Sequence, residues 1–382
     1  RTRPSPSTAR RVFTASLSPT DSRTPSKRKG GALRALAHDP APPGRDASVS
    51  ETLEWRRRAA TQLLMAGHFD EGLAVLRDVL AVVGLTLPSS PRQALLSLLW
   101  RRALVRLRGF GFRRRDKHEL VPKWRIHADV TWTAALGLGM VDNVRGTSFQ
   151  AYHLLAALRL GDPGRVAKAL AAEGLFRGAQ SQRARAAAMG VLDRAEALAR
   201  EVDDPHAIGF VQLGRGIVEH MSARWEAARS HLEDAEHTLR TSCKGVFWEI
   251  NTAQFFLITS AFWSGDFPSL RKIVPPALRE TQARGDVYAL ANLRALACPL
   301  LALADDEPAQ GWSHIAESMS EWSQQGFHVQ HLGALLSQTL LSLYEGDGRA
   351  AYDRTTRAWP NLERSLLLRL ELVRTYMSFF RG

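Results

Sequence analysis

Hydrophobic residues recur every three or four positions from about residue 51 to the end of the 382-residue chain, and short groups of Gly, Asp and Pro interrupt them. This spacing puts apolar side chains on one face of an α-helix, whereas a half-buried strand would alternate at every second residue. The runs Phe255–Phe262 and Leu335–Leu343 are examples. Gly is common just after a helix, while Asp and Pro are common at its start. The pattern therefore predicts an all-α protein made of consecutive helices.

Four of the expected helix starts keep a constant spacing. His206, Phe247, Tyr288 and Val329 are each 41 residues apart. About halfway through each unit, near residues 223, 265, 306 and 346, small residues followed by Asp, Glu or Pro mark a second break. Each unit thus reads as two helices joined by a turn. One hairpin cannot cover its own apolar face, so neighbouring units are expected to stack.

The same pattern of helix, turn and helix recurs earlier in the chain without a strict period. Breaks at Ala66–Glu71 and Leu160–Pro163 divide residues 51–203 into N-terminal helical hairpins, and residues 204–382 form the regular array. The turn signature Gly-Asp-aromatic resembles the tetratricopeptide repeat, whose usual unit is 34 residues. We therefore expect a tetratricopeptide-like α-solenoid of stacked hairpins, with longer helices or linkers.

The net charge of +13 is concentrated in two places. Residues 1–50 carry ten Arg or Lys against three Asp or Glu, and they are rich in Ser, Thr and Pro. Such a segment cannot bury enough apolar area to offset the entropy of ordering, so a disordered basic tail is predicted. Residues 101–117 carry eight basic residues against one acidic residue.

This second concentration lies in a basic segment, residues 91–117, that begins with the apolar stretch Leu95–Trp100. One interpretation is contact with an anionic membrane surface or a phosphate-bearing ligand. The alternative is a solvated, arginine-rich helix and turn, because the arginines do not share one clean helical face. The candidate contact residues are Arg101, Arg102, Arg106, Arg113, Arg114 and Arg115.

The familiar catalytic motifs are missing from the sequence. There is no Gly-Lys pair for a phosphate-binding P-loop, no His-Arg-Asp or Asp-Phe-Gly triplet of a protein kinase, and no Gly-x-Ser-x-Gly elbow of a hydrolase. Gly137–Asp142 begins like a nucleotide loop but follows a helical pattern, so a crossing of helices at small residues is the better interpretation. We expect no catalytic, cofactor-binding or metal-binding residues.

Several smaller groupings have structural interpretations as well as functional ones. His328 and His331 could share a metal, but a third ligand is lacking and helix capping or packing is favoured. Trp248, Glu249 and Gln254, and also Trp312 with Trp322, could line a ligand site, although large aromatic residues at helical spacing usually form core. Cys243 and Cys298 lack a CxxC partner and are expected to be reduced, packed residues.

No uncharged apolar run reaches the length of a membrane span, and the N-terminus lacks the apolar core of a secretory signal. We therefore expect a cytoplasmic protein without a transmembrane segment. The first residue is Arg1 rather than Met, which suggests a processed chain or a fragment of a longer product.

Several motifs together resemble a known type of protein. They are Gly137–Asp142 with Arg145-Gly146 and Phe149-Gln150, Gly245–Glu249 with Thr252–Gln254, Gly285–Tyr288 with Asn292–Arg294, Gly326–His328 with Gln330-His331, and Ser365–Arg369. They resemble the C-terminal helical region of large bacterial serine/threonine protein kinases of the myxobacterial type, in which a kinase domain and an ATPase module precede a tetratricopeptide-like array. The resemblance covers about residues 51–382 and implies a regulatory, partner-sensing segment with kinase and ATPase modules in cis.

Three functions remain open at this point. The first is a non-catalytic module that binds a protein or peptide on the concave surface of the array. The second is the C-terminal part of an active serine/threonine kinase whose catalytic domain lies upstream. The third is the repeat domain of a transcription regulator, which is less favoured because no helix-turn-helix is evident and the basic charge is not spread over the fold.

Overall fold

The computed structural model describes residues 49–65, 68–139, 142–323 and 326–381, and every regular element in these ranges is helical. The all-α prediction is confirmed. Residues 1–48 of the predicted disordered tail lie outside the described residues. Its last two positions, 49 and 50, already belong to the first labelled helix, which begins at Val49. The main helices are α2 (Val49–Met65), α3 (Phe69–Val82), α4 (Pro91–Arg108), α5 (Pro122–Gly139), α6 (Asn143–Leu160), α7 (Pro163–Gln180), α8 (Arg185–Glu201), α9 (Pro205–Met221), α10 (Trp225–Ser242), α11 (Phe247–Trp263), α12 (Phe267–Arg284), α13 (Val287–Asn292), α14 (Cys298–Ala304), α15 (Pro308–Glu321), α16 (Val329–Tyr344), α17 (Gly348–Ser365) and α18 (Glu371–Arg381).

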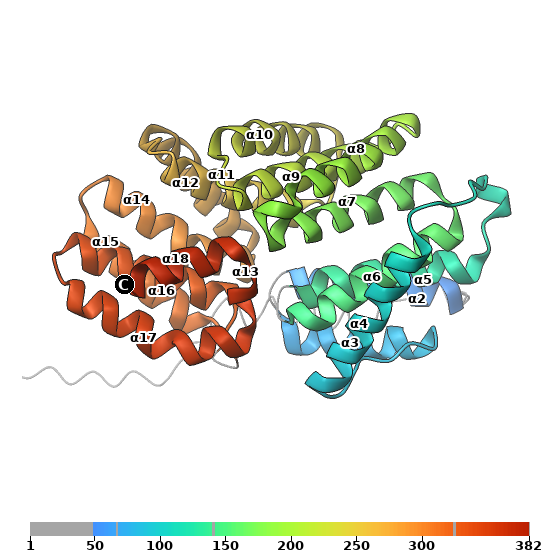
Figure 1. Ribbon diagram of the computed structural model, residues 1–382, viewed down its shortest axis with the longest axis horizontal. Helices are drawn as coiled ribbons and strands as arrows, with labels where there is room; N and C mark the ends of the chain where they lie inside the picture. Colours follow the sequence, from blue (N-terminus) through green and yellow to red (C-terminus); the bar gives the residue numbers. More distant parts are fainter. Residues whose placement is uncertain (1–48, 66–67, 140–141, 324–325, 382) are drawn as a thin grey trace, which may run out of the picture.

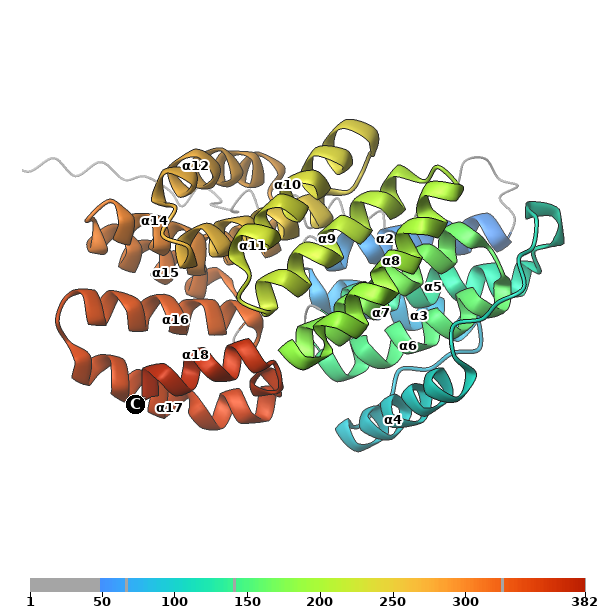
Figure 2. The ribbon, with the colours of Figure 1, turned by 45° about the horizontal axis from the view of Figure 1, so that its top comes forward.

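The helices form antiparallel hairpins that stack into an arch. Extensive contacts join α2 to α3, α5 to α6, α7 to α8, α9 to α10 and α16 to α17, while α14 packs on α15. In Figure 1, α2–α6 form the right side, α7–α12 pass over the top and α13–α18 form the left side. Figure 2 shows the same order from a tilted view, with α4 projecting at the lower edge. The predicted solenoid of stacked hairpins is thus confirmed.

The regular spacing appears in the structure as a repeated backbone conformation. The four residues spaced 41 apart lie at the first or second position of α9, α11, α13 and α16. A left-handed residue recurs inside each hairpin turn and another precedes each unit, and five of these eight sites carry glycine while three carry Ala or Asp. The first series is Ala223, Gly265, Asp306 and Gly346, and the second is Asp203, Gly245, Gly285 and Gly326.

The length of the helices accounts for the 41-residue unit. Helices α9–α12 contain 17 or 18 residues each, and the turns between them are short. Long helices rather than long linkers therefore distinguish this array from one with a 34-residue period. The predicted breaks near residue 67 and at Leu160–Pro163 also separate helices, since α2 ends at Met65 and α6 ends at Leu160.

Aspartate defines where many of the helices begin. In six helices the residue before the first turn is an Asp whose side chain accepts a hydrogen bond from the backbone N–H three residues later. The acceptors are Asp142, Asp162, Asp204, Asp266, Asp286 and Asp347. Such a cap satisfies a donor that the helix leaves unpaired and contributes about 1 kcal/mol.

In the N-terminal hairpins, glycine allows helices to cross closely. A Cβ atom added to Gly146 of α6 would lie 2.6 Å from the backbone nitrogen and 2.7 Å from the Cα atom of Gly139, at the end of α5. Only a residue without a side chain fits there. The interpretation of Gly137–Asp142 as a small-residue helix crossing is therefore confirmed, and Asp142 caps α6.

One stretch of the described chain, Val287–Ala304, is long and apolar enough to span a membrane by length and composition. This stretch contains the charged residue Arg294, so the observation that no uncharged apolar run reaches this length still holds, and the absence of a transmembrane segment stays a prediction. More than half of this stretch is buried in the protein, where it packs against α11, α12, α15 and α16. It has the surroundings of a core helix.

The two ends of the arch touch. The Phe69 ring at the start of α3 packs edge-on against Trp322, at 5.5 Å between centroids, and against Tyr288, at 6.4 Å. We call these three aromatic residues the clasp. A second contact joins the Gln182 backbone N–H to the Glu371 carboxylate at 2.8 Å. The arch is consequently closed by contacts between residues far apart in the sequence.

Candidate functional site

The most distinctive cavity lies where three successive units meet. It has a volume of about 180 Å³ and is lined by the N-terminal half of α11, by α13 and by the start of α16, together with the π-helical turn η3 (Leu293–Ala297). We call it the inter-unit pocket. Its walls are mainly apolar. The lining residues are Trp248, Asn251, Thr252, Gln254, Phe255, Phe256, Tyr288, Ala289, Asn292, Leu293 and Val329.

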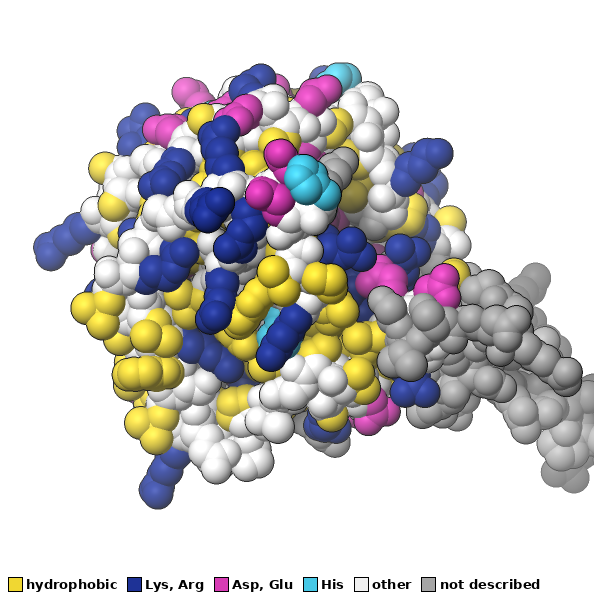
Figure 3. Space-filling view, turned by 90° about the vertical axis from the view of Figure 1, so that its right-hand side faces the viewer, with side chains coloured by type: hydrophobic (Ala, Val, Ile, Leu, Met, Phe, Trp, Pro, Cys, Tyr) yellow, Lys and Arg dark blue, Asp and Glu magenta, His cyan; other side chains and the backbone are white. Residues whose placement is uncertain are grey.

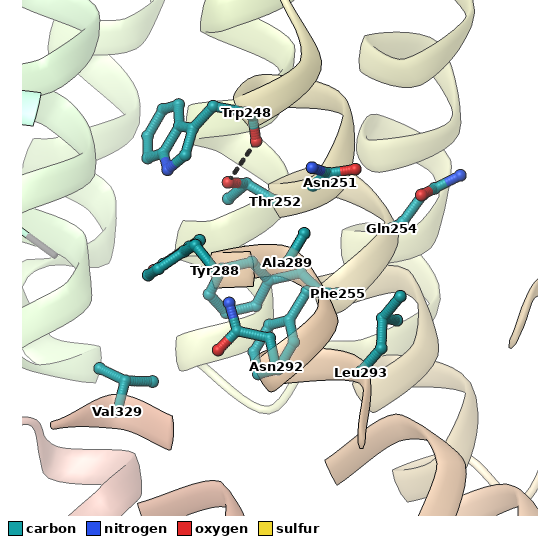
Figure 4. Close-up of a pocket in the computed structure, with 11 residues that line it drawn as sticks. Trp248, Asn251, Thr252, Gln254, Phe255, Tyr288, Ala289, Asn292, Leu293 and Val329 are labelled. Carbon is teal, nitrogen blue, oxygen red and sulfur yellow. Dashed lines mark hydrogen bonds between the residues drawn. The ribbon is translucent and has the colours of Figure 1, made fainter. Parts of the chain in front are cut away.

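Figure 4 shows how these side chains are distributed. Trp248 and Thr252 project from α11 at one side, Tyr288 and Asn292 occupy the middle, and Val329 lies at the opposite side. The Thr252 hydroxyl donates to the Trp248 backbone carbonyl at 2.7 Å, so it is already paired within its own helix. The pocket is therefore bounded by residues of three successive units, although the residues themselves are up to 81 positions apart in the sequence.

Trp248 offers the clearest unused polar group of the pocket. Its indole Nε1 is buried and has no hydrogen-bond partner among the described residues. A buried donor without a partner costs free energy, typically 1–3 kcal/mol, and such groups in folded proteins call for an explanation. This atom has almost no accessible surface, so a ligand carbonyl would supply the missing acceptor only after the side chains that cover it move.

A chain of hydrogen bonds between successive units lies beside the pocket, and we call it the polar ladder. His206 Nε2 donates to Glu249 Oε1 at 2.9 Å, Asn251 Nδ2 donates to Asp286 Oδ2 at 2.8 Å, and Gln330 Nε2 donates to Asn292 Oδ1 at 2.9 Å. Each bond joins the start of one unit's first helix to the start of the next. The ladder thus fixes the relative rotation of the helices that line the pocket.

Burial changes the pKa of Asp286, which belongs to the ladder, and of Tyr288, which lies beside it. Burial raises the pKa of Tyr288 above its usual value, although hydrogen bonds with Asn292 and Gln330 act in the opposite direction. Burial also raises the pKa of Asp286, against the lowering effects of the Ala289 N–H, Arg284 and Asn251. The Tyr288 hydroxyl therefore stays neutral and can serve as a hydrogen-bond donor.

The π-helical turn adds local irregularity to the same wall. Leu293–Ala297 forms a wider helical turn in the middle of an otherwise α-helical segment. Pro299 follows it and has no backbone N–H, which removes one of the regular helical hydrogen bonds and favours the wider turn. Insertions of this kind occur frequently at functional sites.

A larger groove of about 1,100 Å³ runs beside the starts of α7, α9 and α11. It is lined by many charged residues, and most of these form ion pairs within the protein. Arg165 Nε lies 2.8 Å from Asp129, and Lys168 lies 3.2 Å from Asp204. Because these charges are already compensated, the groove offers a ligand little that is unsatisfied. We therefore regard the inter-unit pocket as the candidate site.

One histidine of this groove is nevertheless notable. His153 is buried, its Nδ1 donates to the Ala128 carbonyl at 2.9 Å, and its Nε2 has no partner among the described residues. Burial lowers the pKa of His153 to about 4, with the Ala128 carbonyl and Asp129 acting in the opposite direction. The ring is consequently neutral near pH 7.

Most of the candidate anionic-contact arginines face the protein itself. Arg101 donates to the Ser148 hydroxyl at 3.1 Å, and Arg102 forms an ion pair with buried Glu173 at 2.6 Å. Arg114 pairs with Glu201, while Arg115 donates to the Arg159 carbonyl at 2.8 Å.

Arg106 and Arg113 are exposed. The six residues are therefore not gathered at one site, and their contact with an anionic partner stays a prediction.

The structure also places the aromatic and polar candidates from the sequence at different sites. Trp248 and Gln254 line the pocket, whereas Glu249 belongs to the ladder. Trp312 donates to Glu345 at 3.1 Å, away from Trp322, which is part of the clasp.

The His328 backbone N–H donates to His331 Nδ1 at 3.1 Å, so His331 caps the start of α16 as favoured. The His328 Nδ1 atom accepts from the Trp322 indole at 3.2 Å.

The remaining expectations concern cysteine and metal. Cys298 is buried, and burial raises the pKa of its thiol to about 12, which leaves it unreactive at neutral pH. Cys243 is half-buried and free. Within the described ranges, no group of three or more His, Cys, Asp or Glu is placed to hold a metal ion.

Comparison with known proteins adds no assignment: no protein-family model matches the chain, and no curated protein sequence matches it. The resemblance to kinase C-terminal regions therefore stays a prediction.

Sequence reasoning missed Asn251 and Asn292, although a signal for them exists. Each lies four residues after a residue of the 41-residue register, Phe247 and Tyr288 respectively. Aligning the units on the register would have shown the same amide at the same position of two successive units. Tyr288 and Val329 were noted only as register positions, and the structure places both in the pocket wall.

Proposed function

We propose that this chain is a non-catalytic helical-repeat module of the cytoplasm that binds a protein or peptide partner through the inter-unit pocket. The observation that carries the proposal is the buried, unpartnered indole N–H of Trp248 in an otherwise apolar cavity. Binding sites usually combine apolar walls with a few well-placed polar groups. Here aromatic and aliphatic side chains form most of the wall, and the polar side chains Asn251, Thr252, Gln254 and Asn292 already have hydrogen-bond partners, which leaves the indole N–H as the unused donor.

The size of the pocket favours a side chain over a small molecule. Its volume of about 180 Å³ is below the roughly 300–1,000 Å³ of typical small-molecule sites. A single large apolar side chain of a partner would fill it, and the neighbouring main-chain carbonyl could accept from Trp248. Anchoring by one buried apolar residue is how many interfaces obtain most of their affinity.

A selection with a displayed library of random peptides tests this proposal. Peptides enriched on the purified full chain are synthesised, and their affinities are measured by fluorescence anisotropy. Val329→Trp places a large ring at the rim of the pocket and should weaken binding at least about tenfold, equivalent to about 1.4 kcal/mol. The matched control is Phe247→Trp, at the same register position but outside the pocket, which should bind like the unaltered chain.

Two outcomes would contradict the proposal. One is a selection that enriches no peptide above background. The other is a set of peptides that bind Val329→Trp as tightly as the unaltered chain. Circular dichroism of both variants shows whether the fold is retained, since Val329 and Phe247 each lie at the first position of a helix and are not fully buried.

The resemblance stated above extends this proposal to signalling. On that basis the module would be the regulatory C-terminal part of a serine/threonine kinase, with the kinase and ATPase modules in cis. The upstream reading frame tests this extension. In-frame His-Arg-Asp and Asp-Phe-Gly motifs would support it, whereas a stop codon followed by a separate start site would remove it and leave the binding module intact.

A further inference from the structure

The outer face of α4 carries the largest group of exposed apolar side chains on any one helix. Leu96 is 67% exposed, Trp100 is 66% exposed and Leu107 is 85% exposed, and Leu99 is exposed as well. In contrast, α4 buries only Ala94 and Val105, and its main neighbour is α6. Contiguous exposed apolar groups of this kind mark interaction sites.

These residues share one side of the helix. Leu96, Trp100, Ala103 and Leu107 follow one another at spacings of four, three and four residues, which places them along one face. Ala94 and Val105, which face α6, lie on the opposite side. Figure 2 shows α4 at the edge of the molecule, and the exposure of Leu96, Trp100 and Leu107 shows that this face is open to solvent.

Charge on α4 is of one sign. The helix contains five arginines and no acidic residue. Arg101 and Arg102 turn back to the protein, whereas Arg92 and Arg106 are exposed and lie on the outward side near Leu99 and Ala103. Figure 3 shows Lys and Arg side chains beside the hydrophobic side chains at this end of the molecule.

We propose that the outer face of α4 docks on the surface of an anionic phospholipid bilayer. An apolar stripe of Leu and Trp, flanked by Arg and lacking acidic residues, is the composition of helices that lie in the membrane interface. Trp and Arg side chains both suit the headgroup level, where an apolar body and a polar tip are solvated together. Because α4 lies at the edge of the molecule, it can lie flat on a surface.

Charge argues against two other occupants. Residues 1–48 of this chain carry ten basic residues against three acidic ones, so they repel the arginines of α4. A second copy of the same face would bring Arg92 and Arg106 against themselves. An anionic bilayer satisfies both the apolar stripe and the positive charge. This inference concerns a surface separate from the inter-unit pocket and does not depend on the proposed peptide binding.

Vesicle flotation with the full chain tests the proposal. The chain should float with vesicles made of equal parts phosphatidylcholine and phosphatidylserine, and much less with phosphatidylcholine alone. The triple variant L96S/W100S/L107S should lower the partition coefficient at least about tenfold, because it removes the apolar contact. The double variant R92E/R106E should also lower it at least about tenfold and abolish the preference for phosphatidylserine.

Two control variants test whether any exposed apolar or basic residue affects flotation, or only those of α4. Phe379→Ser removes an exposed aromatic residue at the other end of the molecule, and Arg349→Glu reverses an exposed arginine of α17. Both should float like the unaltered chain. All substituted side chains are exposed, so circular dichroism should show unchanged helicity and peptide binding by the pocket should persist.

Three results would overturn the proposal. The unaltered chain could fail to float with the anionic vesicles, or the α4 variants could float as well as it does. Sedimentation velocity could instead show that the unaltered chain is a dimer and L96S/W100S/L107S a monomer, which would assign the face to a second copy. A partner protein that binds the face while vesicles do not would assign it to an acidic protein.

Discussion

The N-terminal hairpins and the regular C-terminal units join their helices in different ways. In the N-terminal part, helices cross closely at glycine, as at Gly146, and a buried glutamate, Glu173, links α7 to Arg102 of α4. In the C-terminal part, successive units are connected by the polar ladder, with one hydrogen bond per junction. A close crossing depends only on the shapes of the two helices that meet. The ladder, in contrast, requires the same distance between each unit and the next. This difference explains why a constant period occurs in only one half.

The comparison predicts that losing the charge of Glu173 in the N-terminal part costs more than losing the charge of Glu249 in the C-terminal part. Glu173 is almost fully buried and pairs with Arg102 at 2.6 Å and Arg177 at 2.7 Å. Glu173→Gln should lower the free energy of unfolding by about 3 kcal/mol, because it leaves a largely buried arginine without its counter-ion. Urea unfolding followed by circular dichroism measures this loss.

The matched variant in the C-terminal part is Glu249→Gln. Its side chain accepts from His206, and the glutamine oxygen can keep that bond, so a loss of about 1 kcal/mol or less is expected. Equal losses of unfolding free energy for Glu173→Gln and Glu249→Gln would show that these two carboxylates contribute equally to stability in the two halves.

A second prediction concerns the glycine crossing. Gly146→Ala should destabilise the protein by about 1–3 kcal/mol, because the added methyl group meets the Gly139 backbone, which cannot move away as a side chain would. Gly190 of α8 provides the control, since nothing lies within 4 Å of a Cβ atom there. Gly190→Ala should stabilise the chain by about 0.5–1 kcal/mol through helix propensity. The opposite signs should appear as shifts of the urea midpoint in opposite directions.

A third prediction uses one buried histidine from each half. Burial lowers the pKa of His220 to about 3 and that of His153 to about 4, against a usual value of 6.5. Between pH 6.5 and these folded-state values, the unfolded chain binds more protons than the folded chain. Stability should therefore fall as the pH drops below 6.5, by about 2 kcal/mol for each histidine at pH 5.

His153→Asn and His220→Asn remove one titrating ring each while keeping a side-chain amide near the Nδ1 position. Each variant should reduce the difference in unfolding free energy between pH 7 and pH 5 by about 2 kcal/mol. An unchanged pH difference in either variant would assign acid sensitivity to other groups.

The smallest expected effect concerns a feature that the two halves share. Asp162 caps α7 with a hydrogen bond of 2.8 Å to the Arg165 N–H, and Asp347 caps α17 with one of 2.8 Å to the Ala350 N–H. Asp162→Ala and Asp347→Ala should each lower stability by about 1 kcal/mol. Thermal unfolding of the two variants should give similar losses. A loss confined to one variant would mean that capping is also unequal between the halves.

The helix pairs could be predicted from the sequence because their signals are local. An Asp cap and a left-handed residue lie within a few positions of the helix ends that they define, as at Asp286 and Gly285. The pocket could not be predicted in the same way. Trp248 and Val329 are far apart in the chain, and their proximity depends on how three units rotate against one another.

The basic segment shows the same limitation. Its sequence indicates a helix rich in Leu and Arg, but which arginines turn inward depends on Ser148 of α6 and Glu173 of α7. Spacing alone could not separate the inward-facing Arg102 from the exposed Arg106. Side-chain direction in a repeat protein is decided by neighbours that the local pattern does not contain.

An open row of stacked hairpins can lose order from either end, one hairpin at a time, because a terminal unit is held on one side only. The packing of Phe69 against Tyr288 and Trp322 gives the first hairpin a second neighbour from the far half of the chain. Peeling from the N-terminal end must then disturb α13 at the same time. The amide hydrogen exchange rates of α3 and α13 should accordingly rise or fall together, because the two helices lose order at the same time.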